Sequence, residues 1–249
     1  MKTIGIIPAR FASSRFPGKP LVQIGGKTVI QRVYDQARRA RRLDEVVVAT
    51  DDERIREHVE GFGGRVVMTA SHHRSGTERC AEAAGFFDEA DAIINIQGDE
   101  PFIDPLQIDL VAEPLARRMA VKVSTLAKRI EKQEELHSPN VVKVVFNRQQ
   151  EAMYFSRSTI PYLRDVPPGD WLSKAAFYKH IGLYGFRKEV LLELAKLPPS
   201  RYESWESLEQ LRWLYEGFPI FVNLTDKETI GIDTPEDLVQ AIKLINPEE

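Results

Sequence analysis

The stretch TIGIIPARFASSRFPGKPL, residues 3–21, is the most informative part of the sequence. It opens with an apolar run typical of a buried strand, and a polar, cationic loop follows the run directly. The cations of the loop are Arg10, Arg15 and Lys19, and its hydroxyls and bare backbone come from Ser13, Ser14 and Gly18. Because a polyanion can approach such a loop closely, the pattern favours a strand that leads into a binding loop for a nucleoside triphosphate.

The loop does not have the spacing of the commoner phosphate-binding motifs. GGKT at residues 25–28 resembles the end of a Walker A motif, but Leu21 stands where the first glycine is required. The glycines at positions 61, 63 and 64 do not complete a dinucleotide fingerprint either. A loop that holds phosphates with arginine and lysine side chains indicates nucleotidyl transfer.

Composition narrows the class of protein. With 249 residues, 43% of them hydrophobic, the chain can bury a substantial core. A net charge of -3 and a pI near 6.0 argue against a nucleic-acid partner, because such proteins carry a basic excess. The single cysteine, Cys80, cannot form an intrachain disulfide, and we expect it to be a small core residue.

Apolar runs along the chain are short. None approaches the roughly 20 residues that a membrane helix needs, and the apolar stretch near Met1 is too short for a signal peptide. We therefore expect a cytoplasmic protein with no membrane segment.

The first half of the chain alternates short β-branched runs with helical patterns, which is typical of a parallel sheet. The expected strands are residues 4–7, 46–50, 66–68 and 92–96. Open parallel sheets bind ligands beyond the carboxyl ends of their strands, and these ends carry Arg10, Asp51 and the segment 97–100. The sequence therefore predicts a site at this edge.

The second half is organised differently. Closely spaced strand patterns at 123–127, 141–146 and 180–186 predict an antiparallel extension. Helical periodicity returns at residues 188–197, 204–215 and 234–245. In the last helix Thr234 can cap the first turn and Pro235 fits the position after it.

Eight motifs together carry a family resemblance. They are PARFASSRFPGKPL at 8–21, SGTER at 75–79, NIQGDEP at 95–101, VKVV at 142–145, YFSR at 154–157, GLYGF at 182–186, LEQLR at 208–212 and GIDTPEDL at 231–238. In this order, over residues 3–243, they resemble the 3-deoxy-manno-octulosonate cytidylyltransferase family. The resemblance implies an α/β fold with a mostly parallel, Rossmann-like nucleotide-diphospho-sugar transferase sheet flanked by helices.

The resemblance also implies an organisation and an activity. Residues 1–120 and 187–249 would form the nucleotide-binding core, and the antiparallel region 121–186 would bind the acceptor sugar and form a homodimer. The enzyme would transfer CMP from CTP to 3-deoxy-D-manno-octulosonate with Mg²⁺, release pyrophosphate and supply lipopolysaccharide core biosynthesis.

Asp99 is the candidate metal ligand that the residues themselves indicate. It follows an apolar strand, Gly98 permits a tight turn and Pro101 discourages a helix, so the carboxylate should project from the strand end. Because Mg²⁺ takes one or two protein carboxylates, a second acid is expected. The resemblance supplies Asp233.

The resemblance nominates the remaining site residues. Catalytic roles would fall to Arg10, Arg15, Lys19, Asp99 and Asp233. Nucleotide-binding residues would be Ala9, Arg10, Ser13, Ser14, Arg15, Lys19, Thr50, Asp51, Ser75, Gly76, Thr77, Arg79 and Gln97. Sugar-binding residues would be Gln97, Arg157, Arg164, His180, Tyr184, Glu209 and Gln210. On the residues alone, Ser75, Thr77 and Glu78 could form a simple helix cap, and a histidine such as His180 could be a hydrogen-bonded core residue.

Two alternatives stay open at the level of sequence. The acceptor could be a related acid sugar, such as an 8-amino analogue or a nonulosonate, because the residues that contact the far end of the sugar are not identified. The chain could also be a non-catalytic nucleotide-binding regulatory domain, although such a domain is expected to have lost a carboxylate or a loop cation. The adjacent His72 and His73 lack the spacing of a zinc site.

Overall fold

The computed structural model describes residues 1–12, 16–228, 231–232 and 234–245. Its centre is a nine-stranded sheet with the order β11-β7-β10-β6-β1-β4-β5, in which β8 pairs with β10 and β9 pairs with β8. The strands are β1 Thr3–Ala9, β4 Glu45–Thr50, β5 Val66–Met68, β6 Ala92–Asn95, β7 Val123–Arg129, β8 Lys143–Phe146, β9 Ala152–Ser156, β10 Tyr178–Arg187 and β11 Ile220–Leu224. A separate ribbon pairs β2 (Gln23–Ile24) with β3 (Lys27–Thr28).

Strand β1 lies at the centre of the parallel part. It runs parallel to β4 on one side and β6 on the other, and β4 runs parallel to β5. Ile4 and Ile6 face one core cluster and Ile7 faces the other, which is why this strand is apolar along almost its whole length. The four strands predicted for the first half of the chain are confirmed.

Strand β10 reverses direction in the sheet. It is antiparallel to β6, β7 and β8, and β8 forms a hairpin with β9. The predicted antiparallel extension is therefore present, and β7 and β10 continue the same sheet as the parallel strands. The division into a nucleotide-binding core and an acceptor and dimer region at 121–186 stays a prediction.

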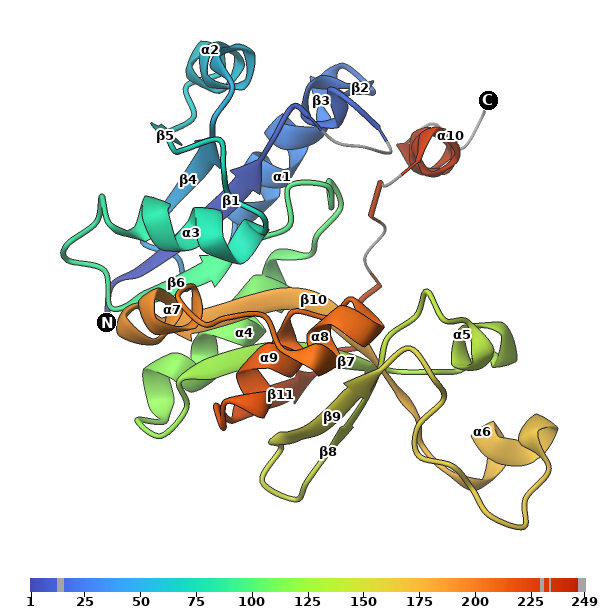
Figure 1. Ribbon diagram of the computed structural model, residues 1–249. Helices are drawn as coiled ribbons and strands as arrows, with labels where there is room; N and C mark the ends of the chain where they lie inside the picture. The colour runs from blue at the N-terminus through green and yellow to red at the C-terminus, as the bar shows by residue number, and fades with distance from the viewer. Residues whose placement is uncertain (13–15, 229–230, 233, 246–249) are drawn as a thin grey trace.

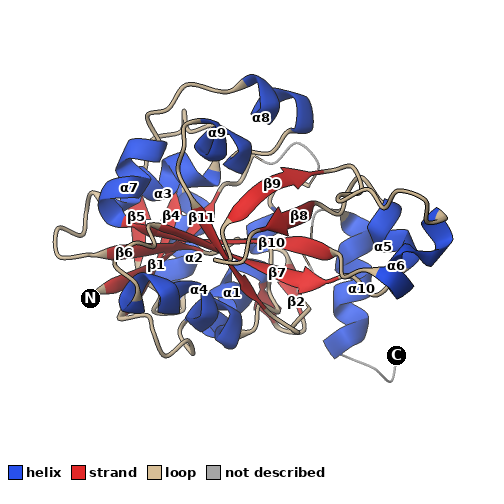
Figure 2. Ribbon diagram, turned by 90° about the horizontal axis from the view of Figure 1, so that it is seen from below, coloured by secondary structure: helices blue, strands red, loops and turns tan. Residues whose placement is uncertain are grey.

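Helices cover both faces of the sheet. Figure 2 shows α3, α7 and α9 on one face and α1 and α4 on the other, in agreement with the two large core clusters. The α-helices are α1 Val29–Ala37, α2 Glu53–Gly61, α3 Gly76–Ala84, α4 Pro105–Arg117, α5 Gln133–His137, α6 Trp171–Lys174, α7 Lys188–Leu194, α8 Arg201–Glu206, α9 Gln210–Tyr215 and α10 Pro235–Ile245, and 3-10 turns lie at η1 Lys19–Leu21 and η2 Pro168–Asp170. Cys80, a residue of α3, is fully buried in the core, as predicted.

The single helix predicted over 204–215 is wrong. The structure has two helices, α8 and α9, separated at Ser207, whose φ of 52° lies in the left-handed region. The turn places Leu208 in the core and presents Glu209 at the start of α9. Local periodicity does not reveal this break, because the turn depends on the burial of Leu208, whereas α8 itself buries no residue and packs against α9.

The last helix begins as predicted. The Thr234 hydroxyl accepts the N–H of Asp237, and the Asp237 carboxylate accepts the N–H of Thr234, which forms a reciprocal cap. Figure 1 shows α10 beside the β2–β3 ribbon, in agreement with its contacts to β2. Within the described residues, no helix has both the length and the apolar character needed to cross a membrane.

Candidate active site

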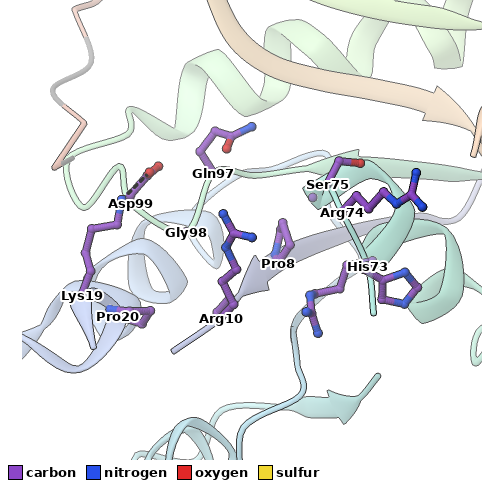
Figure 3. Close-up of a pocket in the computed structure, with 13 residues that line it drawn as sticks. Pro8, Arg10, Lys19, Pro20, His73, Arg74, Ser75, Gln97, Gly98 and Asp99 are labelled. Atoms are coloured by element: carbon purple, nitrogen blue, oxygen red, sulfur yellow. Dashed lines mark hydrogen bonds and ion pairs between the residues drawn. The ribbon is translucent and has the colours of Figure 1, made fainter. Parts of the chain in front are cut away.

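A pocket opens at the carboxyl ends of β1 and β6, where the sequence predicts a site (Figure 3). From the predicted set it gathers Ala9, Arg10, Lys19, Ser75, Gly76, Arg79, Gln97 and Asp99. Backbone packing shapes the floor, since a Cβ atom on Gly98 would lie 2.7 Å from the carbonyl oxygen of Pro8. The parallel register that aligns Ala9 with Thr50 also brings the end of β4 to this edge.

Lys19 and Asp99 form an ion pair in the lining of the pocket (Figure 3). The Lys19 Nζ lies 2.8 Å from Asp99 Oδ2, and 30% of the Asp99 side chain remains accessible to solvent. The neighbouring carboxyl of Glu100 is buried, and this burial together with the charge of Asp99 raises its pKa to about 8. The Glu100 carboxyl is therefore mostly protonated at neutral pH, and Asp99 is the acid that lines the pocket.

Arg10 projects from the end of β1 into the same pocket (Figure 3). Its side chain is exposed, and its guanidinium makes no hydrogen bond or ion pair to any described residue. A cation held open at the end of a strand is available to a phosphate. Ser13, Ser14 and Arg15, which were predicted to join it, lie outside the described residues.

The segment before α10 reaches Asp99 as well. The N–H of Ile232 donates a 2.9 Å hydrogen bond to the backbone carbonyl of Asp99. The Ile232 side chain is buried with Ile24 and Val29. Asp233, the predicted second acid, is the next residue in the chain and lies outside the described residues.

Arg79 is buried and already paired. Its Nη2 lies 3.1 Å from Asp51 Oδ1, and its Nη1 donates to the hydroxyl of Thr69. Thr50 is fully buried, and its hydroxyl accepts the N–H of Asp52. These contacts tie α3 to the ends of β4 and β5, so Thr50 and Asp51 support the pocket from behind and do not line it.

Ser75 and Thr77 connect α3 to α9. Ser75 caps α3 by accepting the N–H of Glu78. The Ser75 and Thr77 hydroxyls also donate to the Glu209 carboxylate at 2.9 and 2.7 Å. Burial raises the pKa of Glu209, and these bonds and Arg212 oppose that rise. The helix cap is therefore present, and Ser75 also lines the pocket, whereas Thr77 is buried and does not line it.

His180 and Tyr184 lie side by side on β10. Their ring centroids are 5.3 Å apart, and His180 also meets the ring of Phe155 and the hydroxyl of Thr125. Burial lowers the pKa of His180 to about 3, so its imidazole is neutral at physiological pH. Gln97 reaches toward the same strand and donates to the carbonyl of Gly182 at 2.9 Å.

The other predicted sugar-binding residues are dispersed. Arg157, on the segment after β9, donates to the carbonyls of Glu206 and Pro139, and Gln210 is buried at the start of α9. Arg164 is 90% exposed beside Asp165, on the loop that precedes α6. Within the described residues Arg164 is not brought to the pocket.

The pocket also contains side chains that sequence reasoning did not assign to it. His73 and Arg74 line it, and Figure 3 shows them beside Ser75. The His73 ring bonds to the Glu82 carboxylate, which also accepts the N–H of Ala70. Their position immediately before the SGTER motif was the available signal. Among the described residues no cluster of three or more His, Cys, Asp or Glu side chains is arranged to hold a metal.

Comparison with known proteins defines the class. The sequence model of the family described as "Cytidylyltransferase" matches residues 4–230. A synthase of 4-diphosphocytidyl-2C-methyl-D-erythritol from Anaerococcus prevotii has the same fold, with a TM-score of 0.63, 16% identity, and coverage of 98% of this chain and 99% of that chain. The chain therefore belongs to the cytidylyltransferase family.

Within this family, the chain is highly similar to enzymes named for one acid sugar. It is 53% identical to the 3-deoxy-manno-octulosonate cytidylyltransferase of Parabacteroides distasonis, over 98% of each chain. It is also 42% identical to a solved CMP:2-keto-3-deoxy-manno-octonic acid synthetase complexed with CTP, with a TM-score of 0.92 over the full length of both. The resemblance found in the motifs is confirmed, and the chain is a nucleotidyltransferase of this branch.

Proposed function

We propose that this enzyme transfers CMP from CTP to 3-deoxy-D-manno-octulosonate and releases pyrophosphate. Two observations together support the proposal. Arg10, Lys19 and Asp99 line a pocket at the carboxyl edge of the sheet. The chain is also similar over its full length to a synthetase that was solved with CTP. The product would be the activated sugar for lipopolysaccharide core synthesis.

The triphosphate lies along the loop that follows β1. Arg10 is open toward the pocket, and Lys19 supplies a second cation from the far end of the loop. Ser13, Ser14 and Arg15 complete the phosphate contacts in this proposal. Ala9, Ser75, Gly76 and Gln97 line the pocket, and in this proposal they contact the nucleoside.

Mg²⁺ is the proposed cofactor, held by Asp99 and Asp233. The donor set suits it, because Mg²⁺ takes one or two carboxylates together with phosphate oxygens and water. The bond from Ile232 to Asp99 supports the pairing, since Asp233 directly follows Ile232 in the chain. When bound, the ion supplies charge neutralisation and acidifies the attacking hydroxyl.

The acceptor sugar lies on the β10 side of the pocket. Gln97 follows β6, His180 and Tyr184 lie on the adjacent strand β10, and Glu209 and Gln210 begin α9, whose Trp213 packs against the ring of Tyr184. Arg157 and Arg164 are proposed to meet the carboxylate of the acid sugar.

These residues bind and orient, and none forms a covalent intermediate. In-line attack on phosphorus requires positioned cations more than a protein nucleophile. Arg10 and Lys19 neutralise charge on the phosphates as pyrophosphate leaves. His180 is neutral and half enclosed by aromatic rings, so its role is to hydrogen-bond and not to carry charge.

A homodimer and a cytoplasmic location are further parts of this proposal. Two large side chains on the antiparallel extension support the dimer, because Met153 and Tyr162 are 66% and 74% exposed. Analytical ultracentrifugation of the wild type and of M153E tests it, with a monomeric variant as the expected result. A monomeric wild type contradicts it.

Pyrophosphate release tests the reaction. The wild type is assayed with each of the four nucleoside triphosphates, with and without the octulosonate and Mg²⁺. Release that needs CTP, the sugar and the metal together is expected. Equal use of ATP removes the assignment of the base, and no release under any condition favours the regulatory-domain alternative. Parallel assays with 8-amino and nonulosonate acids identify the preferred acceptor.

A further inference from the structure

The ring of Phe11 joins the two ends of the phosphate-binding loop. The N–H of Gly18 donates a 2.9 Å hydrogen bond to the carbonyl of Phe11. Gly18 has a φ of +73°, and a Cβ atom there would lie 3.1 Å from Cζ of the Phe11 ring. The backbone of Gly18 thus passes close against the ring, and the loop between these residues is closed at its base.

Arg54 stacks on the same ring from another part of the chain. Its guanidinium carbon lies 3.4 Å from the centroid of the Phe11 ring, a short cation–π contact. The guanidinium is held in place by Asp52, because Arg54 Nε donates to Oδ1 at 2.9 Å and Nη2 donates to Oδ2 at 2.6 Å. Asp52 is itself the cap of α2, directly after β4, so the stack is anchored to the sheet.

Within the described part of the chain, Arg56, a second arginine on α2, makes only surface ion pairs. Arg56 pairs with Glu53 at 2.6 Å and approaches Glu60 at 3.8 Å, both on its own helix. Arg54 differs because it reaches out of the helix to an aromatic residue in the loop. Surface ion pairs alone contribute little to stability, so the stack is the distinguishing contact.

We propose that Arg54 is a positioning residue for the nucleotide, acting through Phe11. The two pocket cations flank the closed base, since Arg10 precedes Phe11 and Lys19 follows Gly18. Holding the base therefore holds both cations at their separation before the triphosphate arrives. Loop ends that are held in place in advance lose less conformational freedom on binding, which strengthens binding. This inference rests on the proposed placement of the triphosphate along the loop.

The test compares R54M and R54K with the matched control R56M. The KM for CTP, kcat and the thermal unfolding temperature are measured, together with amide hydrogen exchange of the peptide that covers residues 10–21. We expect R54M to raise the KM for CTP by about two- to fivefold with kcat unchanged, which is the fold-change of an exposed cation–π contact. Exchange in the peptide should speed up, and R56M should change neither quantity.

R54K separates stacking from simple charge. A lysine keeps the positive charge but lacks the planar guanidinium that stacks and forks onto Asp52. The inference expects R54K to behave like R54M. If R54K matches the wild type while R54M is weakened, long-range attraction of the triphosphate explains the effect and the stacking role is wrong. If R54M matches the wild type in both KM and exchange, the role is also wrong.

F11L provides an independent test of the stack, because it changes the loop residue and leaves helix α2 unaltered. It keeps an apolar side chain against Gly18 but removes the ring face, so it should reproduce the R54M effects. The double variant that combines R54M with F11L should bind CTP no more weakly than the weaker of the two single variants, because both changes remove the same contact. A wild type that does not use CTP contradicts the proposed function, whereas the exchange measurement still tests the closed loop base.

Discussion

The backbone of Ile232 is hydrogen-bonded to the backbone of Asp99, N–H to carbonyl, at 2.9 Å. The bond joins the loop after β6 to the segment that leads into α10. Because the Ile232 side chain is buried with Ile24 and Val29, the segment is held from both sides. The two motifs GDEP and GIDTPED, far apart in the sequence, therefore meet at one edge of the pocket.

Loss of either proposed metal ligand should stop the reaction. We expect D99N and D233N each to lower kcat by at least about a hundredfold, since charge stabilisation is the main contribution to such transfers. The double variant should be little worse than either single variant, because both acids hold one ion. Full activity in D99N contradicts the metal assignment.

The matched control for these variants is D226N. Asp226 is an exposed acid on the segment after β11, away from the pocket. Its kcat should equal that of the wild type. Direct titration with Mn²⁺ should show weaker ion binding in D99N and D233N, and unchanged binding in D226N.

Removal of the Lys19 ammonium should weaken use of CTP. K19M loses a charge that lies 2.8 Å from Asp99, on the side of the pocket where we propose that the phosphates bind. We expect kcat/KM for CTP to fall by about ten- to a hundredfold, as for one charge-assisted hydrogen bond. K27M is the control, because Lys27 makes a comparable 2.7 Å pair with Asp35 on the exposed surface. Similar losses in both variants would argue against a specific role.

We expect Lys143 to stabilise the folded protein. It is fully buried, and its Nζ donates to the carbonyls of Ser138, Val141 and Arg157. K143M leaves these three oxygens without their donor and should lower the free energy of unfolding by about 3 kcal/mol or more. Urea unfolding measures this. Exposed Lys132 is the control, and K132M should stay within about 0.5 kcal/mol of the wild type.

His180 should contribute to acid sensitivity. Its pKa falls from 6.5 to about 3 on folding, so between these values the unfolded chain binds the proton and the folded chain does not. His180 therefore does not lower the free energy of unfolding above pH 6.5, and it lowers this free energy increasingly as the pH falls from 6.5 toward 3. H180Q should show a shallower decline in unfolding free energy over this window. An NMR titration of the wild-type imidazole with a pKa near 6.5 would contradict the burial argument.

Several elements could be predicted because the determining signals are local. The apolar run of β1 and the Thr234 cap of α10 both depend on residues that are close together in the chain. The break at Ser207 was missed because the left-handed turn is stabilised by burial of Leu208, a contact that periodicity does not contain. Strands β9 and β11 were not predicted, although the run Ile220–Leu224 is apolar enough to indicate one.

The same distinction applies to the site. The order of the motifs was sufficient to indicate the family, the cationic loop and the acid of GDEP, because these depend only on residue type and spacing in the sequence. Position in space was needed to show that Arg79 is neutralised by Asp51, that Glu209 bonds to Ser75 and Thr77, and that Arg54 stacks on Phe11. Each of these contacts joins residues from separate elements, and sheet order and register set which side chains meet.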